Sequence, residues 1–211
     1  MSLRRALAPC AVVLAVVATP IHAQSGASLK GLLGNASDAA LDKLSQPGAF
    51  SADSAIRIGL PGGGSRLDGL MKLADRAGVT NDLQARLNDA AEKAASEAKP
   101  IFRSAIDRAS MSDAVAIAKG GRTGATDYLR RTSGNEITAK LMPLVRGALD
   151  RAGVLRQAQQ LSALGMDEKK IVAYVTGKTS DGIFTYVGRE EERLRANPLE
   201  SGKELLKGLK F

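Results

Sequence analysis

Residues 182–198, GIFTYVGREEERLRANP, decide the fold class, because their apolar positions repeat with the period of an α-helix. Four positions follow one another at spacings of four, three and four residues, so a helix places them on one face. They are Ile183, Val187, Glu190 and Leu194. Pro198 ends the helix, because the residue before a proline disfavours helical backbone. The stretch predicts an amphipathic helix with one carboxylate on its apolar face.

The rest of the chain repeats this pattern, and no pair of strands is predicted. Ser, Thr and Asp stand at the predicted helix starts, and glycine or proline stands at the predicted ends. We therefore predict an all-α fold, a single-domain multi-helix bundle with short loops and at most one short extended segment near 55–60. Pro100 kinks the helix that begins near residue 81, or divides it from a segment that reaches Ala109. The predicted helices cover residues 28–45, 65–77, 81–98, 112–120, 123–131, 135–152, 154–164, 167–176, 180–196 and 203–210.

The first residues have the three parts of a secretory signal peptide. Arg4 and Arg5 give a positive start, residues 11–18 an apolar centre, and residues 21–23 a cleavage site. We predict a signal peptide over residues 1–23 with cleavage after Ala23, a single helical domain over 24–211, and a periplasmic location. An N-terminal membrane anchor is the alternative, but the apolar run is much shorter than the ~20 residues that span a bilayer.

Loss of the signal peptide would remove much reactive chemistry. Cys10 and His22 are the only cysteine and the only histidine. A mature chain without thiol or imidazole excludes disulfides, Ser-His-Asp and Cys-His catalysis, and zinc sites built on Cys or His. We therefore expect no catalytic residues, no metal and no cofactor, and we predict that the protein is not an enzyme.

The charge is mildly basic and dispersed. The net charge is +8, and it becomes +6 once Arg4 and Arg5 are removed. Acidic and basic residues alternate along most segments, which is typical of a solvated surface. This composition favours at most weak contact with an anionic membrane or polysaccharide surface, and aromatic residues are too few for us to expect a nucleic-acid partner.

Carboxylates on predicted apolar faces are the candidate site residues. An unpaired Glu190 would be costly to bury, so it should find a cationic or donor partner or stay protonated. Glu191 and Arg195, four residues apart, can pair on the neighbouring flank. Asn88 and Glu92 have the same spacing on the 81–98 helix. These groups could form an acid/base pair, a hard-metal site or structural contacts between helices, and the last reading is favoured.

Two glycine-rich stretches resemble anion-binding loops. IGLPGGGSR (58–66) has the glycine spacing of a phosphate loop but lacks the Lys-Ser or Lys-Thr that such a loop requires, so a turn into a helix is favoured. GGRTGAT (120–126) gathers Arg122, Thr123 and Thr126 at a predicted helix start. The helix dipole and the hydroxyls there would suit a phosphate or a carboxylate, while two caps and a solvated arginine are the simpler alternative.

Several motifs together resemble one bacterial family. They are LNDAAEKA (87–94), the A-T-x-Y pattern of Ala125 to Tyr128, the Leu141-Met-Pro143 segment and GIFxxVxxEExxLRxNP (182–198). The family is the secreted or lipoprotein-like domain of unknown function 4197, and the likeness covers about residues 40–211. It has no established activity, so the resemblance implies a location and candidate residues only. Its polar motif positions fall on Asn88, Glu92, Thr126, Tyr128, Glu190, Glu191 and Arg195.

We expect Glu190 and Arg195 to join the 81–98 and 180–196 helices, with Thr126 or Tyr128 donating to them. The favoured function is a non-enzymatic module of the periplasm or cell envelope that binds an envelope protein or a small ligand. A carboxylate-dependent hydrolase or lyase that uses Glu92 and Glu190 is one alternative. A basic protein that adheres to anionic lipid or polysaccharide is the other.

Overall fold

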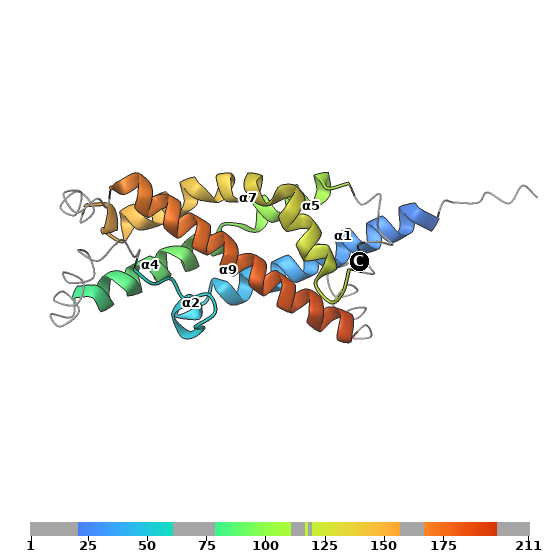
Figure 1. The fold of residues 1–211 in the computed structure, drawn as a ribbon, viewed down its shortest axis with the longest axis horizontal. Helices are drawn as coiled ribbons and strands as arrows, with labels where there is room; N and C mark the ends of the chain where they lie inside the picture. The colour runs from blue at the N-terminus through green and yellow to red at the C-terminus, as the bar shows by residue number, and fades with distance from the viewer. Residues whose placement is uncertain (1–20, 61–78, 111–116, 118–119, 157–166, 198–211) are drawn as a thin grey trace, which may run out of the picture.

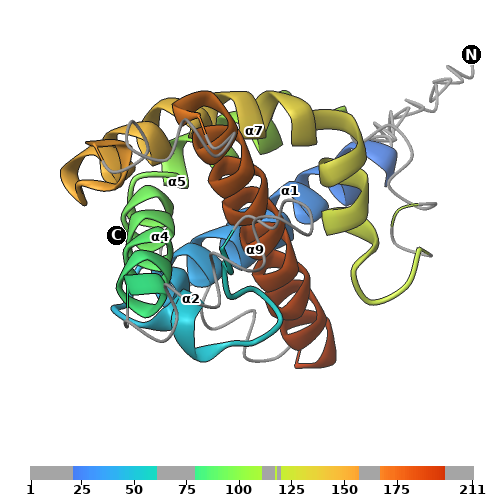
Figure 2. The same cartoon turned by 60° about the vertical axis from the view of Figure 1, so that its left-hand side comes forward.

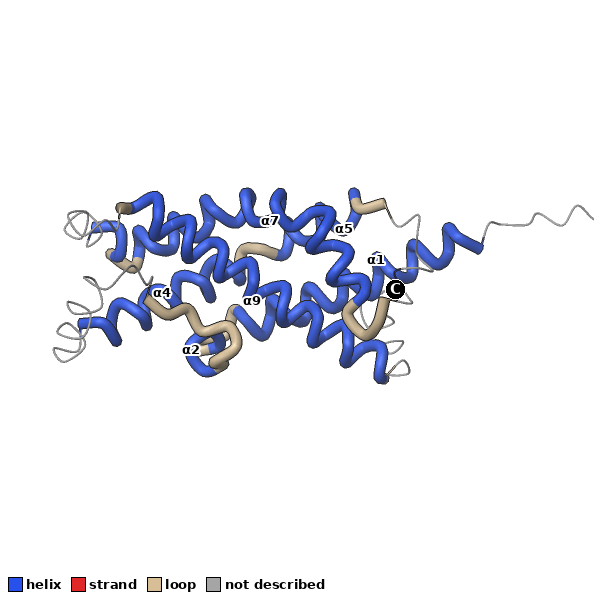
Figure 3. The backbone as a smooth tube through the Cα atoms, viewed as in Figure 1, coloured by secondary structure: helices blue, strands red, loops and turns tan. Residues whose placement is uncertain are grey.

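A computed structural model describes residues 21–60, 79–110, 117, 120–156 and 167–197, and within them the chain is helical. Figure 3 shows helices and loops but no strand in the described part of the chain. The all-α prediction is therefore confirmed. Residues 55–60 form a turn followed by irregular backbone, which agrees with at most one short extended segment.

Three long helices, α1, α7 and α9, organise the described part of the molecule. The longest, α9, runs diagonally across it and packs most extensively against α1 and α7, while α4 packs mainly against α7 (Figure 1). Figure 2 shows α1 crossing α9 and α7 bending over the same helix. The helices are α1 (Ile21–Leu44), α2 (Ala49–Ala52), α4 (Val79–Ser96), α5 (Lys99–Arg108), α7 (Gly124–Arg151) and α9 (Glu168–Ala196).

The core follows the apolar face predicted for residues 182–198. Ile183, Val187 and Leu194 are buried, and they join a cluster of alanine, leucine and isoleucine side chains from α1, α4, α5 and α7. Aromatic packing is sparse: Phe184 contacts Phe102 of α5 at 5.4 Å between ring centres. Small side chains therefore bring the helices close together.

Two glycines of α9 lie where neighbouring segments approach it closely. A Cβ at Gly182 would lie 2.8 Å from the ring of Phe50, which is fully buried. A Cβ at Gly188 would lie 3.3 Å from a methyl carbon of Thr123, just before α7. Glycine in a helix costs about 1 kcal/mol relative to alanine. Here it allows α9 to contact the α2 region and the start of α7.

Two predicted helix breaks are wrong. The helices predicted over 123–131 and 135–152 form the single helix α7, and those over 167–176 and 180–196 form the single helix α9. The helical backbone continues through both positions, where the hydroxyls of Thr132 and Thr179 donate to the carbonyls four residues earlier and so are satisfied within the helix. Packing of buried residues on both sides outweighs the weak helix propensity of the intervening residues.

Other boundaries are confirmed. Pro100 lies at the start of α5 and divides it from α4, and Asp167 caps α9 by accepting from the Lys170 amide at 2.8 Å. Gly153 follows α7 with φ of +75°. The predicted helices over 65–77 and 203–210, the glycines of the 58–66 loop from Gly62 on, and most of 112–120 and 154–164 lie outside the described residues. Among the described helices, none is both long and apolar enough to cross a membrane.

Candidate functional site

Consecutive carboxylates on α9 reach two different neighbours. Successive helical residues project about 100° apart, so Glu190 and Glu191 cannot face the same partner. Glu190 faces α1, whereas Glu191 faces the first turn of α7. Both are buried, at 4% and 0% exposure. The two residues therefore connect α9 to the helices against which it packs most extensively.

Glu191 caps the N-terminus of α7 from another helix. Its carboxylate accepts from the amides of Ala125 and Thr126 at 3.0 and 2.7 Å and from the Thr126 hydroxyl at 2.6 Å. Arg195 adds a charged bond through Nε at 2.7 Å, four residues along α9. Free amides and the positive end of a helix dipole stabilise such an anion. The helix start at residues 120–126 thus binds a carboxylate, and that carboxylate is the side chain of Glu191 in the same chain.

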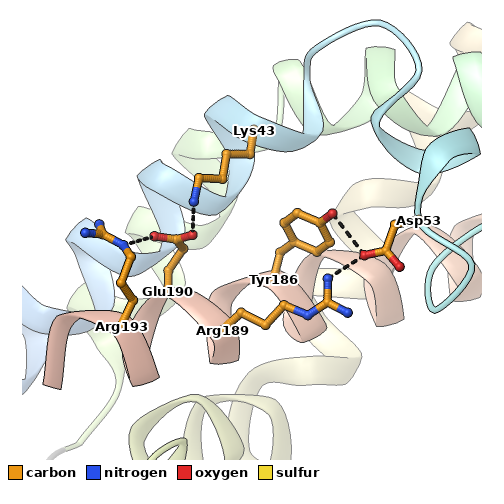
Figure 4. A network of polar contacts seen from close by, with 6 residues as sticks. All are labelled: Lys43, Asp53, Tyr186, Arg189, Glu190 and Arg193. Atoms are coloured by element: carbon orange, nitrogen blue, oxygen red, sulfur yellow. Dashed lines mark hydrogen bonds and ion pairs between the residues drawn. The ribbon is translucent and has the colours of Figure 1, made fainter. Parts of the chain in front are cut away.

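Glu190 is paired rather than protonated (Figure 4). It accepts from Lys43 of α1 and, at 2.8 Å, from Nε of Arg193 on its own helix. Burial acts to raise its pKa, but the hydrogen bonds and charges of Lys43 and Arg193 together lower the pKa below its ordinary value. The pair links the last turn of α1 to α9.

A second contact lies one turn earlier on the same side of α9 (Figure 4). Asp53 accepts from Arg189 and, at 3.0 Å, from the hydroxyl of Tyr186. The Arg189 guanidinium also lies 4.8 Å from the Tyr186 ring centre, within cation–π range. The hydrogen bond from Arg189, with smaller help from the amide of Ala55, lowers the Asp53 pKa. Burial and the bond to Asp53 raise the Tyr186 pKa.

Asn88 and Glu92 hold loop backbone onto α4. Glu92 accepts from the amides of Gly48 and Phe50, both at 3.0 Å, and so fixes the turn in which Gly48 has φ of +83°. Asn88 donates to and accepts from the backbone of Ile58, with both bonds at 2.9 Å. The side-chain amide of Asn88 thus supplies the donor and the acceptor that a neighbouring strand would otherwise provide to Ile58.

The expectation that Glu190 and Arg195 join α9 to the 81–98 helix is wrong, whereas the predicted pairing of Glu191 with Arg195 is confirmed. Arg195 pairs with Glu191, because it lies four residues beyond Glu191 but five beyond Glu190, and side chains four apart are neighbours on a helix. Glu92 and Glu190 share no partner among the described residues. The polar contacts therefore join α9 to α1 and α7, and not to α4 as we expected.

The remaining predicted residues lie at the start of α7 or in its first turns without joining Glu190. Thr126 donates to Glu191, as one of the two expected donors, but Tyr128 does not. Arg122, with 82% of its side chain exposed, forms a surface ion pair, and Thr123 hydrogen-bonds within the first turn. Tyr128 donates to a backbone carbonyl preceding α7. The partners of Arg122, Thr123 and Tyr128 are Glu192, Asp127 and Ser110, respectively.

Five residues of these polar contacts were not among the predicted site residues, and only one of them could have been identified from its spacing in the sequence. Arg193 lies three residues after Glu190, a spacing at which side chains meet on a helix. Asp53, Tyr186 and Arg189 had no such signal, because Asp53 belongs to a loop more than 130 residues away in sequence. Lys43 comes from the end of α1, 147 residues before Glu190.

A comparison with family models confirms the resemblance that the sequence motifs indicated. A family model described as protein of unknown function (DUF4197) matches residues 20–209. The chain belongs to this family. The match begins earlier than the resemblance near residue 40 suggested, and it includes all of the polar contacts described above. No curated protein and no solved structure matches the chain significantly.

In this DUF4197 member, the hydrogen bonds to the buried glutamates leave their carboxylates little capacity to bind a metal ion or a substrate. Glu191 and Glu92 each accept at least two backbone amides, and Glu190 accepts from two cations. Across the described ranges, no group of three or more His, Cys, Asp or Glu side chains is placed to hold a metal ion.

A cavity of about 380 Å³ lies elsewhere, between the C-terminal half of α7 and the first turn of α9. None of the predicted site residues lines it. Its lining residues are Pro143, Arg146, Gly147, Asp150, Leu155, Arg156 and Glu168.

Proposed function

We propose that the chain is a non-enzymatic helical module of the periplasm or cell envelope that binds a partner or a small ligand. The observation that supports this most strongly is the environment of Glu191. Its carboxylate is fully buried and accepts three hydrogen bonds from α7 and one from Arg195. Such a group stabilises the fold and has little capacity left for a substrate.

The other carboxylates support the same reading. A general acid or base works best with a pKa near the operating pH and within reach of the substrate. The pKa of Glu190 is shifted downward, away from neutral pH, by its partners Lys43 and Arg193 acting against burial. Glu92 is engaged by loop backbone. We therefore assign all three glutamates a structural role.

A hydrolase or lyase that uses Glu92 and Glu190 is less well supported. Such an enzyme would need the two carboxylates to converge in one cleft. They instead bind different segments, the turn before α2 and the end of α1, and neither lines the described cavity.

Adhesion to anionic surfaces also gains little support, because exposed basic side chains on the described helices are commonly paired with acids. Such pairing reduces the field that an anionic surface would meet. Examples are Lys99–Asp42, Arg103–Asp38, Arg108–Glu136, Arg130–Asp181 and Arg146–Glu168.

Native mass spectrometry of the chain, recovered gently from the periplasm of its own cells, tests the proposal. We expect a species that begins at Gln24 and has a reproducible added mass, and we expect the Glu190→Gln variant to retain that mass. In parallel, periplasmic extracts are incubated with each protein and followed by mass spectrometry of small molecules. Turnover by the wild type that a folded Glu190→Gln variant loses would overturn the proposal in favour of an enzyme.

A further inference from the structure

The cavity between α7 and α9 lies far from the buried glutamates. Glu168 lines it at the first turn of α9, and Glu190 is 22 residues further on, a distance of about 33 Å along a helix. The volume of about 380 Å³ falls within the usual range for small-molecule sites. A ligand in this cavity would therefore leave the contacts of Glu190 and Glu191 undisturbed.

Part of the cavity wall is apolar. Pro143 is exposed and contributes hydrocarbon surface, whereas Leu155, at 6% exposure, presents only a small part of its side chain. Gly147 also lines the cavity, and the guanidinium of Arg151 lies 3.5 Å from where its Cβ would be. An aliphatic group of modest size could lie against this wall and gain from the removal of its surface from water.

The charged lining is balanced. Arg146 and Glu168 pair across the cavity from α7 to α9 at 2.5 Å. In contrast, the side chains of Asp150 and Arg156 have no hydrogen-bond or ion-pair partner within the described ranges. Among its described lining residues, the cavity thus presents one unpaired anion and one unpaired cation, both exposed, beside an apolar wall.

This balance selects a class of ligand. A simple anion could pair with Arg156 but would meet the like charge of Asp150, and a simple cation would have the reverse problem, since like charges at close range repel. A zwitterion satisfies both groups with charge-assisted hydrogen bonds, which are the stronger kind. A small aliphatic side chain on that zwitterion would complete the match with Pro143 and Leu155.

We propose that this cavity binds a free α-amino acid, with its carboxylate on Arg156, its ammonium on Asp150 and its side chain against Pro143 and Leu155. The proposal rests on the proposed binding function and gives it a ligand class. Recognition of the two charged groups sets the affinity, and the apolar wall favours an aliphatic side chain over none.

Titration of the ¹⁵N-labelled mature chain with leucine tests this, followed by amide chemical shifts. Leucine should give saturable shifts for residues near 143–156. N-acetyl-leucine, which lacks the ammonium, and leucinamide, which lacks the carboxylate, should each bind about tenfold more weakly or worse, the loss expected for one charge-assisted hydrogen bond. Glycine should bind more weakly than leucine.

Variants locate the site. Asp150→Asn and Arg156→Gln should each weaken leucine binding about tenfold or more. Arg108→Gln is the matched control, because Arg108 is an exposed arginine that pairs with Glu136 and does not line the cavity. It should bind leucine as the wild type does.

No saturable shift up to about 10 mM leucine, a concentration that covers weak binding, would overturn the proposal. So would equal binding of N-acetyl-leucine and leucine, or unchanged binding by Asp150→Asn. A different added mass in native mass spectrometry, together with failure of leucine, would refute only the ligand class. Turnover that depends on Glu190 would instead refute the proposed function.

Discussion

The two ends of α9 differ in how their charges are satisfied. At the C-terminal end, Glu190 and Glu191 are buried, and each has partners from another helix and from α9 itself. At the N-terminal end, the cavity leaves Asp150 and Arg156 without a partner within the described ranges. One end of α9 thus stabilises the bundle, whereas the other end borders a cavity whose unpaired charges, among the described residues, come from α7 and the segment that follows it. Residues 182–198, one of the motifs that resemble the family, belong to the stabilising end.

The largest expected effect comes from Glu191→Ala. The change leaves the Arg195 charge and the first amides of α7 without their acceptor. Breaking a buried ion pair costs about 3–5 kcal/mol, and we expect a value near the lower limit because Arg195 is partly exposed. Urea unfolding measures the loss.

Glu192→Ala is the control for this substitution. Glu192 is the next residue, and its partner Arg122 is 82% exposed. An exposed pair contributes about 0–1 kcal/mol. Similar losses for the two variants would show that Glu191 is no more important to the fold than a surface carboxylate.

Alanine substitutions at two glycines of α9 should have the next largest effect on stability. Alanine at Gly182 would place a Cβ 2.8 Å from the buried Phe50 ring, and overpacking of this kind costs about 1–3 kcal/mol. Alanine at Gly177 meets nothing within 4 Å and should stabilise the helix by up to about 1 kcal/mol. Thermal unfolding should therefore move in opposite directions for the two variants, and a shared direction would contradict the close approach of α9 to the α2 region.

These contrasts show how far the sequence predicts the molecule. Helical periodicity identified the fold class and the buried position of Glu190, because both depend on spacing within one helix. It placed Glu191 on a flank, since periodicity within α9 cannot show that the start of α7 covers that flank. Lys43 and Asp53 could not be foreseen, because packing of distant segments determines which cation meets which carboxylate.

The wrong helix breaks have a related cause. Gly177 and Gly134 lower the local helix propensity, and the sequence alone weighs that loss without the packing that compensates for it. Gly182 and Gly188 show the converse, because their missing side chains are explained only by Phe50 and Thr123 across the interface.

A smaller effect should depend on pH. The folded-state pKa of Glu190 is lowered below its ordinary value of 4.5, mainly because Lys43 and Arg193 outweigh burial. The ionised pair therefore stabilises the fold above the unfolded-state pKa, and this contribution is lost as the pH falls through the folded-state pKa. The stability difference between wild type and Glu190→Gln should shrink as urea unfolding is repeated from about pH 7 to about pH 3. A difference that grows on acidification would contradict the ionised pair.

One comparison tests most directly the claim that the two ends of α9 have different roles. It is the free energy of unfolding of Glu191→Ala beside that of the double variant Asp150→Ala/Arg156→Ala, measured in urea under the same conditions. We predict a loss of about 3 kcal/mol for the first, because a buried charge loses its partner. For the second we predict a change within about 0.5 kcal/mol, because exposed, unpaired side chains contribute little. A stable Glu191→Ala protein, or a double variant that loses as much, would contradict the account.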